Sequence, residues 1–117
     1  MTTNNIVSLI QESIRKYYPD NIYDDRDYRN DLQLIDEGKY PNMTELRKHQ
    51  NELGIKKIRV TGDNQYICLE SMVNQKTVKL KYVEGVIYQV INTKERVADE
   101  LVDKQKLDEI MNYLLND

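Results

Sequence analysis

The most constraining feature of this sequence is a change in the spacing of its apolar residues at Ile55. Before this point apolar side chains recur every three or four residues, and after it they alternate with polar ones until about Asn92. The first spacing predicts amphipathic helices, whereas alternation predicts strands with one buried face. We therefore expect helices followed by a sheet.

Four alternating runs predict four strands, at residues 55–61, 65–71, 77–83 and 86–92. Polar turn residues separate the first pair at 62–64 and the last pair at 83–85. Because short connections favour antiparallel neighbours, the simplest topology is a four-stranded meander.

Two helices are predicted before the sheet. The first covers residues 5–18 and is stopped by Pro19. The second covers residues 43–53, where Asn42 is the N-cap and Glu45 completes a capping box.

The chain returns to helical spacing after the sheet. Apolar residues between 97 and 102 predict a short helix or turn, and Asp103 caps a longer helix over 104–115. Val102 and Leu107 are spaced as a hydrophobic staple across that cap. The predicted fold class is α+β, in which a four-stranded antiparallel sheet packs with N-terminal helices and a C-terminal helix as a two-layer sandwich. The length of 117 residues predicts a single domain over 1–117.

Negative charge is concentrated between residues 20 and 37. Seven carboxylates stand against two arginines there, which gives −5, whereas the whole chain carries −3. The first half of this segment has little apolar periodicity, so we predict a loop over 20–38 between two capped helices, where a binding loop is tolerated. The carboxylates are Asp20, Asp24, Asp25, Asp27, Asp31, Asp36 and Glu37.

The first functional hypothesis is that this acidic segment binds a larger basic protein, such as a nuclease or another nucleic-acid-handling complex. An array of carboxylates at phosphate-like spacing would mimic nucleic acid and give fast, salt-sensitive association. Tyrosine and arginine are the anchors that interface hot spots favour, and we expect both tyrosines of the segment at the surface. The candidate partner-binding residues are Tyr23, Asp24, Asp25, Arg26, Asp27, Tyr28, Arg29 and Asp31.

Composition connects this hypothesis with a class of proteins. Residue types with AT-rich codons dominate, and Ala98 is the one alanine. This composition is common in low-GC bacteria, their phages and other mobile elements, so we expect an inhibitor or regulator of that type. One alternative remains open, in which the acidic segment is a counter-charge for the protein's own basic residues, since residues 39–61 carry +4.

The second hypothesis is a nucleic-acid or nucleotide-binding accessory protein. Strand alternation places several basic side chains and an aromatic ring on one sheet face, a combination that binds single-stranded nucleic acid. A pI near 5.2 argues against a dedicated nucleic-acid binder. The residues are Lys57, Arg59, Tyr66, Lys79 and Lys81. The third hypothesis is a homo-oligomeric scaffold or sequestering protein, formed by edge-to-edge pairing of the apolar strands.

No pattern in the sequence predicts catalysis. His49, the single histidine, lies in a basic helical run, and Cys68 lies in the middle of a predicted strand. We expect His49 to be a solvated residue on a helix face, because the sequence shows no positioned catalytic partner for it, and Cys68 to be a buried or half-buried strand residue. The acidic segment lacks the glycine of a calcium loop. We therefore predict a non-enzymatic protein without a metal or cofactor.

The same sequence predicts a cytoplasmic protein. It contains no apolar run near the roughly 20 residues that span a bilayer. Residues 1–5 lack the basic and apolar regions of a secretory signal, so none is expected. A single cysteine also rules out an intramolecular disulfide.

Overall fold

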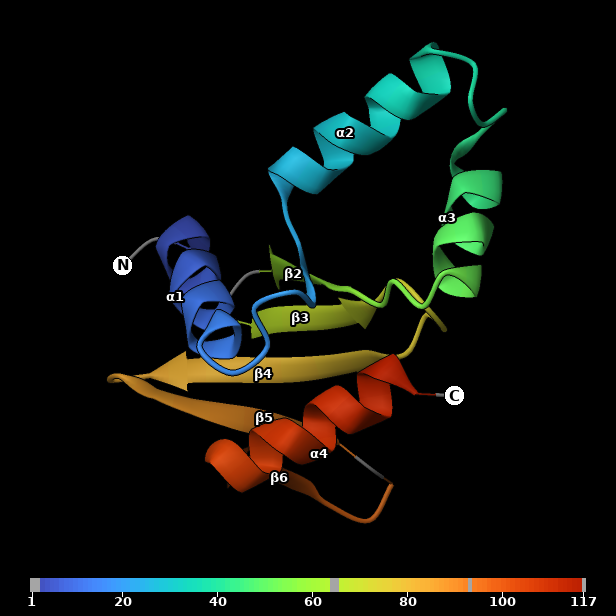
Figure 1. The fold of residues 1–117 in the computed structure, drawn as a ribbon. Helices are drawn as coiled ribbons and strands as arrows, with labels where there is room; N and C mark the ends of the chain where they lie inside the picture. The colour runs from blue at the N-terminus through green and yellow to red at the C-terminus, as the bar shows by residue number, and fades with distance from the viewer. Residues whose placement is uncertain (1–2, 64–65, 93, 117) are drawn as a thin grey trace.

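The computed structural model describes residues 3–63, 66–92 and 94–116, without the side chains of Thr3, Asn4 and Asp63. Over these ranges the fold is α+β, with four helices and a mixed sheet of six strands (Figure 1). The helices are α1 (Thr3–Arg15), α2 (Asp25–Asp36), α3 (Met43–Glu52) and α4 (Lys104–Leu115). The strands are β1 (Ile22–Tyr23), β2 (Ile58–Asp63), β3 (Tyr66–Ser71), β4 (Thr77–Val83), β5 (Val86–Asn92) and β6 (Val97–Leu101).

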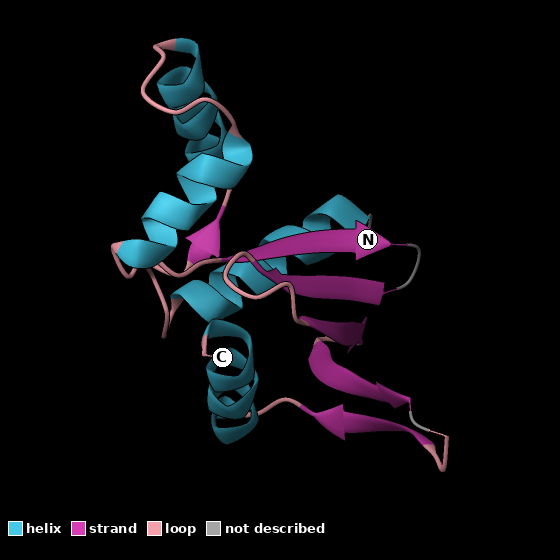
Figure 2. Cartoon of the chain, turned by 90° about the vertical axis from the view of Figure 1, so that its right-hand side faces the viewer, coloured by secondary structure: helices cyan, strands magenta, loops and turns pink. Residues whose placement is uncertain are grey.

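The strands lie side by side in the order of the sequence. β1 runs parallel to β2, and every later neighbour is antiparallel. Helices α1 and α4 lie on the same side of the sheet, where Figure 2 shows them behind and below the upper strands. The core therefore forms between these two helices and one sheet face. Its largest fully buried apolar side chains are Ile10, Ile58, Leu69, Met111 and Leu114.

Helices α2 and α3 stand away from this core as a separate pair at one end of the sheet (Figures 1 and 2). The Cα radius of gyration is 15.4 Å, compared with about 13 Å for a spherical domain of this length. Each helix of the pair buries one side chain, Asp31 in α2 and Leu46 in α3. The pair, named here the α2–α3 lobe, is therefore held to the sheet with little apolar contact.

The sheet is larger than the four antiparallel strands that the sequence predicts. One additional strand is β1, whose two residues pair with Ile58 and Arg59 far along the chain. The other is β6, where the sequence predicts a short helix or turn. Its apolar residues fit a helical spacing as well as an alternating one, and pairing with β5 decides in favour of the strand.

The acidic segment is mostly helix, and the prediction of a loop over 20–38 is wrong. Asp24 is the N-cap of α2, and its carboxylate accepts hydrogen bonds from the backbone N–H groups of Arg26 and Asp27. The Asp27 carboxylate accepts in return from the Asp24 N–H at 3.0 Å. This capping box starts a helix whose first turn is acidic, which the helix dipole favours.

Most of the other predicted elements are confirmed. Strands 77–83 and 86–92 and helix 104–115 have the predicted bounds, and helix 43–53 ends one residue early. Helix 5–18 ends at Arg15, and strand 55–61 begins at Ile58. Glu84 and Gly85 form the last turn with φ of 50° and 84°, as a two-residue hairpin requires. The predicted 62–64 turn extends beyond the described residues.

None of the helices in the described ranges combines the length and the apolar character needed to cross a bilayer. The loops that join the sheet to the α2–α3 lobe are short, so they hold the lobe close to the sheet. The lobe and β1 together position the side chains of the candidate site.

Candidate functional site

Strand β1 is held against β2 by hydrogen bonds, and this pairing positions the first residue of the site, Tyr23. The Ile58 N–H donates to the Asn21 carbonyl at 2.8 Å, and the Asn21 side-chain amide donates to the Lys56 carbonyl at 2.9 Å. These bonds hold the two residues of β1 beside β2, and the chain then turns at Asp24 into α2. Tyr23 is thereby placed between the sheet and the α2–α3 lobe.

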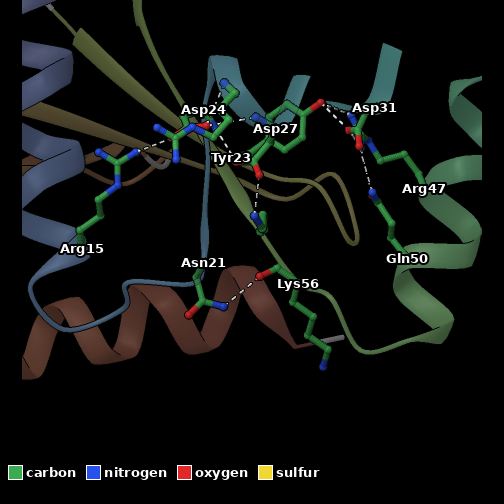
Figure 3. A network of polar contacts seen from close by, with 11 residues as sticks. Arg15, Asn21, Tyr23, Asp24, Asp27, Asp31, Arg47, Gln50 and Lys56 are labelled. Carbon is green, nitrogen blue, oxygen red and sulfur yellow. Dashed lines mark hydrogen bonds and ion pairs between the residues drawn. The ribbon is translucent and has the colours of Figure 1, made fainter. Parts of the chain in front are cut away.

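A buried polar network joins Tyr23, α2 and α3 (Figure 3). The Asp31 carboxylate is 4% exposed and accepts from the Tyr23 hydroxyl at 2.7 Å and from the Arg47 guanidinium at 2.6 Å. Gln50 donates to its other oxygen at 3.1 Å, and Arg47 donates to the Tyr23 hydroxyl at 2.7 Å. The guanidinium also lies 4.6 Å from the centre of the Tyr23 ring. A buried carboxylate satisfied on both oxygens holds the two helices in one arrangement.

A second carboxylate of α2, that of Asp27, is paired with a lysine just before β2. Asp27 accepts a hydrogen bond from the Lys57 ammonium at 2.9 Å, and both side chains are one quarter exposed. Asp24 forms an ion pair with Arg15 of α1 at 3.0 Å, which Figure 3 shows reaching across from that helix. Asp24, Asp27 and Asp31 therefore each have a cationic partner within the protein.

Burial and pairing act in opposite directions on these groups. Burial works to raise the pKa of Asp27, but the Lys57 ammonium and the Asp24 N–H outweigh it and hold that pKa below its ordinary value. Burial also works to lower the pKa of Arg47, and its bonds to Asp31 and Tyr23 outweigh that effect and raise the pKa. Burial, followed by the bond to Asp31, raises the pKa of Tyr23. Each group keeps its usual protonation state at neutral pH, as ion pairs with a structural role do.

The helical period of α2 divides the predicted partner-binding residues into two faces. Asp24, Asp27 and Asp31 follow one another at spacings of three and four residues on the paired face. Tyr23 is buried beside them, so the prediction that this ring lies at the surface is wrong. The residues left on the outer face are Asp25, Arg26, Tyr28 and Arg29.

This outer face forms one wall of a cleft of about 860 Å³ between α1, the start of α2 and β2. Four arginines line the cleft, with Tyr28 beside them and Asp24 and Asp25 as its carboxylates. The arginines are Arg15, Arg26, Arg29 and Arg59. We name this feature the arginine cleft.

The arginines of the cleft differ in what they already contact. Arg15 is bound to Glu12 and Asp24, and Arg59 lies 5.7 Å from the centre of the Tyr23 ring. Within the described part of the chain, the side chains of Arg26 and Arg29 make no hydrogen bond or ion pair, and both residues are exposed. Two guanidinium groups are therefore available at the cleft for a ligand outside the chain.

Two of the five residues of the predicted nucleic-acid face are engaged by other parts of the molecule. Lys57 is engaged by Asp27, and Arg59 lines the arginine cleft. The other three stay together on the sheet face opposite α1 and α4. The Lys79 ammonium lies 5.0 Å from the centre of the Tyr66 ring, and Lys81 pairs with Asp99 at 3.3 Å.

Sequence reasoning missed the residues that other elements contribute, which are Arg15, Arg47 and Gln50. One signal was available in the sequence, since Asp24, Asp27 and Asp31 are spaced as one face of a helix. His49 is exposed, with the Tyr40 ring 5.5 Å from its own, and Cys68 is half-buried on β3. Among the described residues, no group of three or more His, Cys, Asp or Glu side chains is arranged to hold a metal ion.

The chain matches no protein-family model, no curated protein and no solved structure.

Proposed function

We propose that this chain is a non-enzymatic interaction protein that binds a partner protein in the arginine cleft. The observation that carries the proposal is the pair Arg26 and Arg29, exposed at the cleft without a partner among the described residues. Arginine with tyrosine is the combination that interface hot spots favour, and Tyr28 is 47% exposed next to them. The carboxylates that pair with Arg47 and Lys57 position this surface.

Photo-crosslinking from the cleft tests this proposal. Tyr28 is replaced by the photoreactive amino acid p-benzoylphenylalanine, and the variant is irradiated in the cells that produce the protein. The matched control carries the same replacement at Tyr113 of α4, which is 50% exposed and lies outside the cleft. We expect a discrete protein adduct from position 28 alone. Equal adducts from both positions, or no protein adduct from position 28, would refute the proposal.

A basic partner remains the second candidate, because some carboxylates of the acidic segment stay available. Asp20, Asp25, Asp36 and Glu37 are exposed, although Glu37 contacts Lys39 at 3.4 Å. A phage or mobile-element inhibitor that mimics nucleic acid would use such carboxylates. Exchange of Asp20, Asp25 and Asp36 for Asn should then weaken partner binding and flatten its salt dependence. Unchanged binding would remove this candidate.

Two further candidates rest on the sheet. Tyr66, Lys79 and Lys81 share one face, and fluorescence anisotropy with single-stranded oligonucleotides at low salt tests them as a nucleic-acid site. Strand β6 is an edge of the sheet and exposes Val97, which is compatible with pairing between two copies of the chain. Light scattering tests that scaffold hypothesis, since a monomer at high concentration would remove it.

A further inference from the structure

The arginine cleft contains a free length of sheet edge. β1 pairs only with Ile58 and Arg59, whereas β2 continues to Asp63. Beyond Arg59, the described structure places no strand on this side of β2. Val60 and Thr61 of this free length line the cleft (Figure 2 shows β2 extending past β1). The wall of the cleft therefore includes residues of the β2 edge as well as arginines.

The direction of the backbone groups follows from the hydrogen bonds at the start of β2. The Ile58 N–H points to β1, where it donates to Asn21, whereas the Lys57 carbonyl points to β3, where it accepts from Met72. Because these directions alternate along a strand, Val60 and Gly62 direct their polar groups to the same side as Ile58. The Val60 N–H is used in the pairing of Tyr23 with Arg59, so the free groups within the described residues are the Val60 carbonyl and both backbone groups of Gly62. Free backbone groups at a sheet edge are a template for another strand.

The charge at this edge selects among incoming strands. Arg26 and Arg29 come from the first turns of α2, and Arg59 comes from β2 itself. Asp24 is occupied by the cap of α2 and by Arg15, which leaves Asp25 as the carboxylate least engaged at the cleft. A strand that carries carboxylates at alternate positions complements this arrangement, because residues two apart lie on one face, about 7 Å from each other. Guanidinium groups bind carboxylates in a bidentate manner.

We propose that the arginine cleft binds an extended acidic segment of the partner protein, which adds as a strand to the free edge of β2. Alternate carboxylates of this segment bind Arg26, Arg29 and Arg59, while its backbone pairs with the Val60 carbonyl and with Gly62. The inference rests on the proposed function and specifies its partner.

The edge favours a peptide over a nucleic acid. Backbone N–H and C=O groups of β2 are matched by another peptide backbone, and strand addition is an established way to recognise a peptide. A phosphodiester backbone supplies acceptors and no donors, so it leaves the carbonyl groups of the edge unpaired. The net charge of −3 also opposes a long polyanion.

An NMR titration of the ¹⁵N-labelled protein tests the inference. The probe is a blocked six-residue peptide that alternates glutamate and valine. A second peptide has the same side chains and N-methyl groups on alternate backbone nitrogens. A third replaces glutamate by lysine, and a fourth probe is an eight-nucleotide oligothymidylate. N-methylation removes backbone donors without changing charge, so this comparison isolates strand addition.

We expect the glutamate peptide to shift the amide signals of Val60, Thr61 and Gly62, with a Kd of about 1 mM or below. The N-methylated peptide should bind at least about tenfold more weakly, since it loses the backbone hydrogen bonds that its N–H groups would donate to the edge. Arg26→Glu with Arg29→Glu should abolish the shifts. Lys39→Glu with Lys48→Glu makes the same change of charge on exposed residues outside the cleft and should preserve them.

Three outcomes would overturn the inference. They are the absence of shifts at β2, equal affinity for the N-methylated peptide, and saturation of the same signals by the oligothymidylate. A protein crosslinked from position 28 together with any of these outcomes would leave the proposed function standing and remove strand addition.

Discussion

Asp31 is a carboxylate that the fold buries between two helices and the Tyr23 ring. Its position in α2 is one that a core-facing helix would fill with an apolar side chain. The Arg47 guanidinium, the Tyr23 hydroxyl and the Gln50 amide satisfy it instead. Removing one member of a buried ion pair leaves an uncompensated charge, which costs more than the pair contributes.

Asp31→Asn should lower the free energy of opening of the α2–α3 lobe by about 3 kcal/mol, because Arg47 loses its buried counter-charge. Amide hydrogen exchange of α2 and α3 measures this opening. Asp36→Asn is the matched control on the exposed end of the same helix and should change it by less than about 0.5 kcal/mol. Equal effects of the two variants would show that the network is not what holds the lobe.

The contribution of Asp27 to the stability of the folded protein should depend on pH. Its pKa is lowered in the folded protein, so its contribution to stability is complete above the unfolded value of about 3.9. That contribution is lost as the pH falls through the lower folded value. The stability difference between the wild type and Asp27→Asn should therefore be greatest near neutral pH and shrink in acid.

NMR titration of the Asp27 carboxyl carbon gives the direct measurement. Lys57→Met should raise the pKa of Asp27, because burial then acts without the opposing ammonium. A wild-type pKa at or above about 3.9 would contradict the ion pair between these residues.

The α2–α3 lobe is the element whose stability depends most on polar contacts. Its two helices bury one residue each, whereas β3 and β4 bury several and pack against α4. Since apolar burial is the dominant stabilising term, the lobe should open locally before the sheet unfolds.

In the wild type, amide protons of α2 and α3 should exchange through an opening of lower free energy than those of β3 and β4. Native-state hydrogen exchange in low concentrations of urea measures both. A single common opening energy would show that the lobe is part of one cooperative unit with the sheet.

The elements also show how much could be predicted from the sequence. Helices with a local cap and strands joined by a tight turn were predicted well, because Asn42, Asp103 and Gly85 carry signals within a few residues. β1 could not be predicted, since its two residues are a strand only through pairing with Ile58 and Arg59. Asp24 and Asp27 have the spacing of a capping box, which is a signal for the start of α2. These carboxylates were instead predicted to lie in an acidic loop.

The candidate site could be predicted only in part, because the sequence carries local signals but does not show tertiary contacts. The sequence located the segment 23–31, and Arg26, Tyr28 and Arg29 do line the cleft. It could not show that Asp31 binds Arg47, because that contact depends on how α2 and α3 pack. Tertiary pairing thus changes an expected acidic surface into a cleft in which arginines predominate.

At the scale of the whole molecule, the arrangement is a sheet covered on one face by α1 and α4 and extended at one end by the lobe (Figure 1). The lobe places the first turns of α2 over the free edge of β2, and the arginine cleft lies at this junction. We propose that this cleft recognises an acidic partner. The negative charge expected of the partner distinguishes this proposal from the hypothesis of a basic partner.

Isothermal titration calorimetry tests this proposal by comparing the affinity of the crosslinked partner for the wild type and for two charge-reversed variants. Arg26→Glu with Arg29→Glu should weaken binding at least about 30-fold, because interface charge pairs are worth 2 kcal/mol or more. Lys39→Glu with Lys48→Glu makes the same change of net charge outside the cleft and should alter it less than about threefold. Equal weakening by both variants, or tighter binding after reversal of Arg26 and Arg29, would show that the cleft does not recognise an acidic partner.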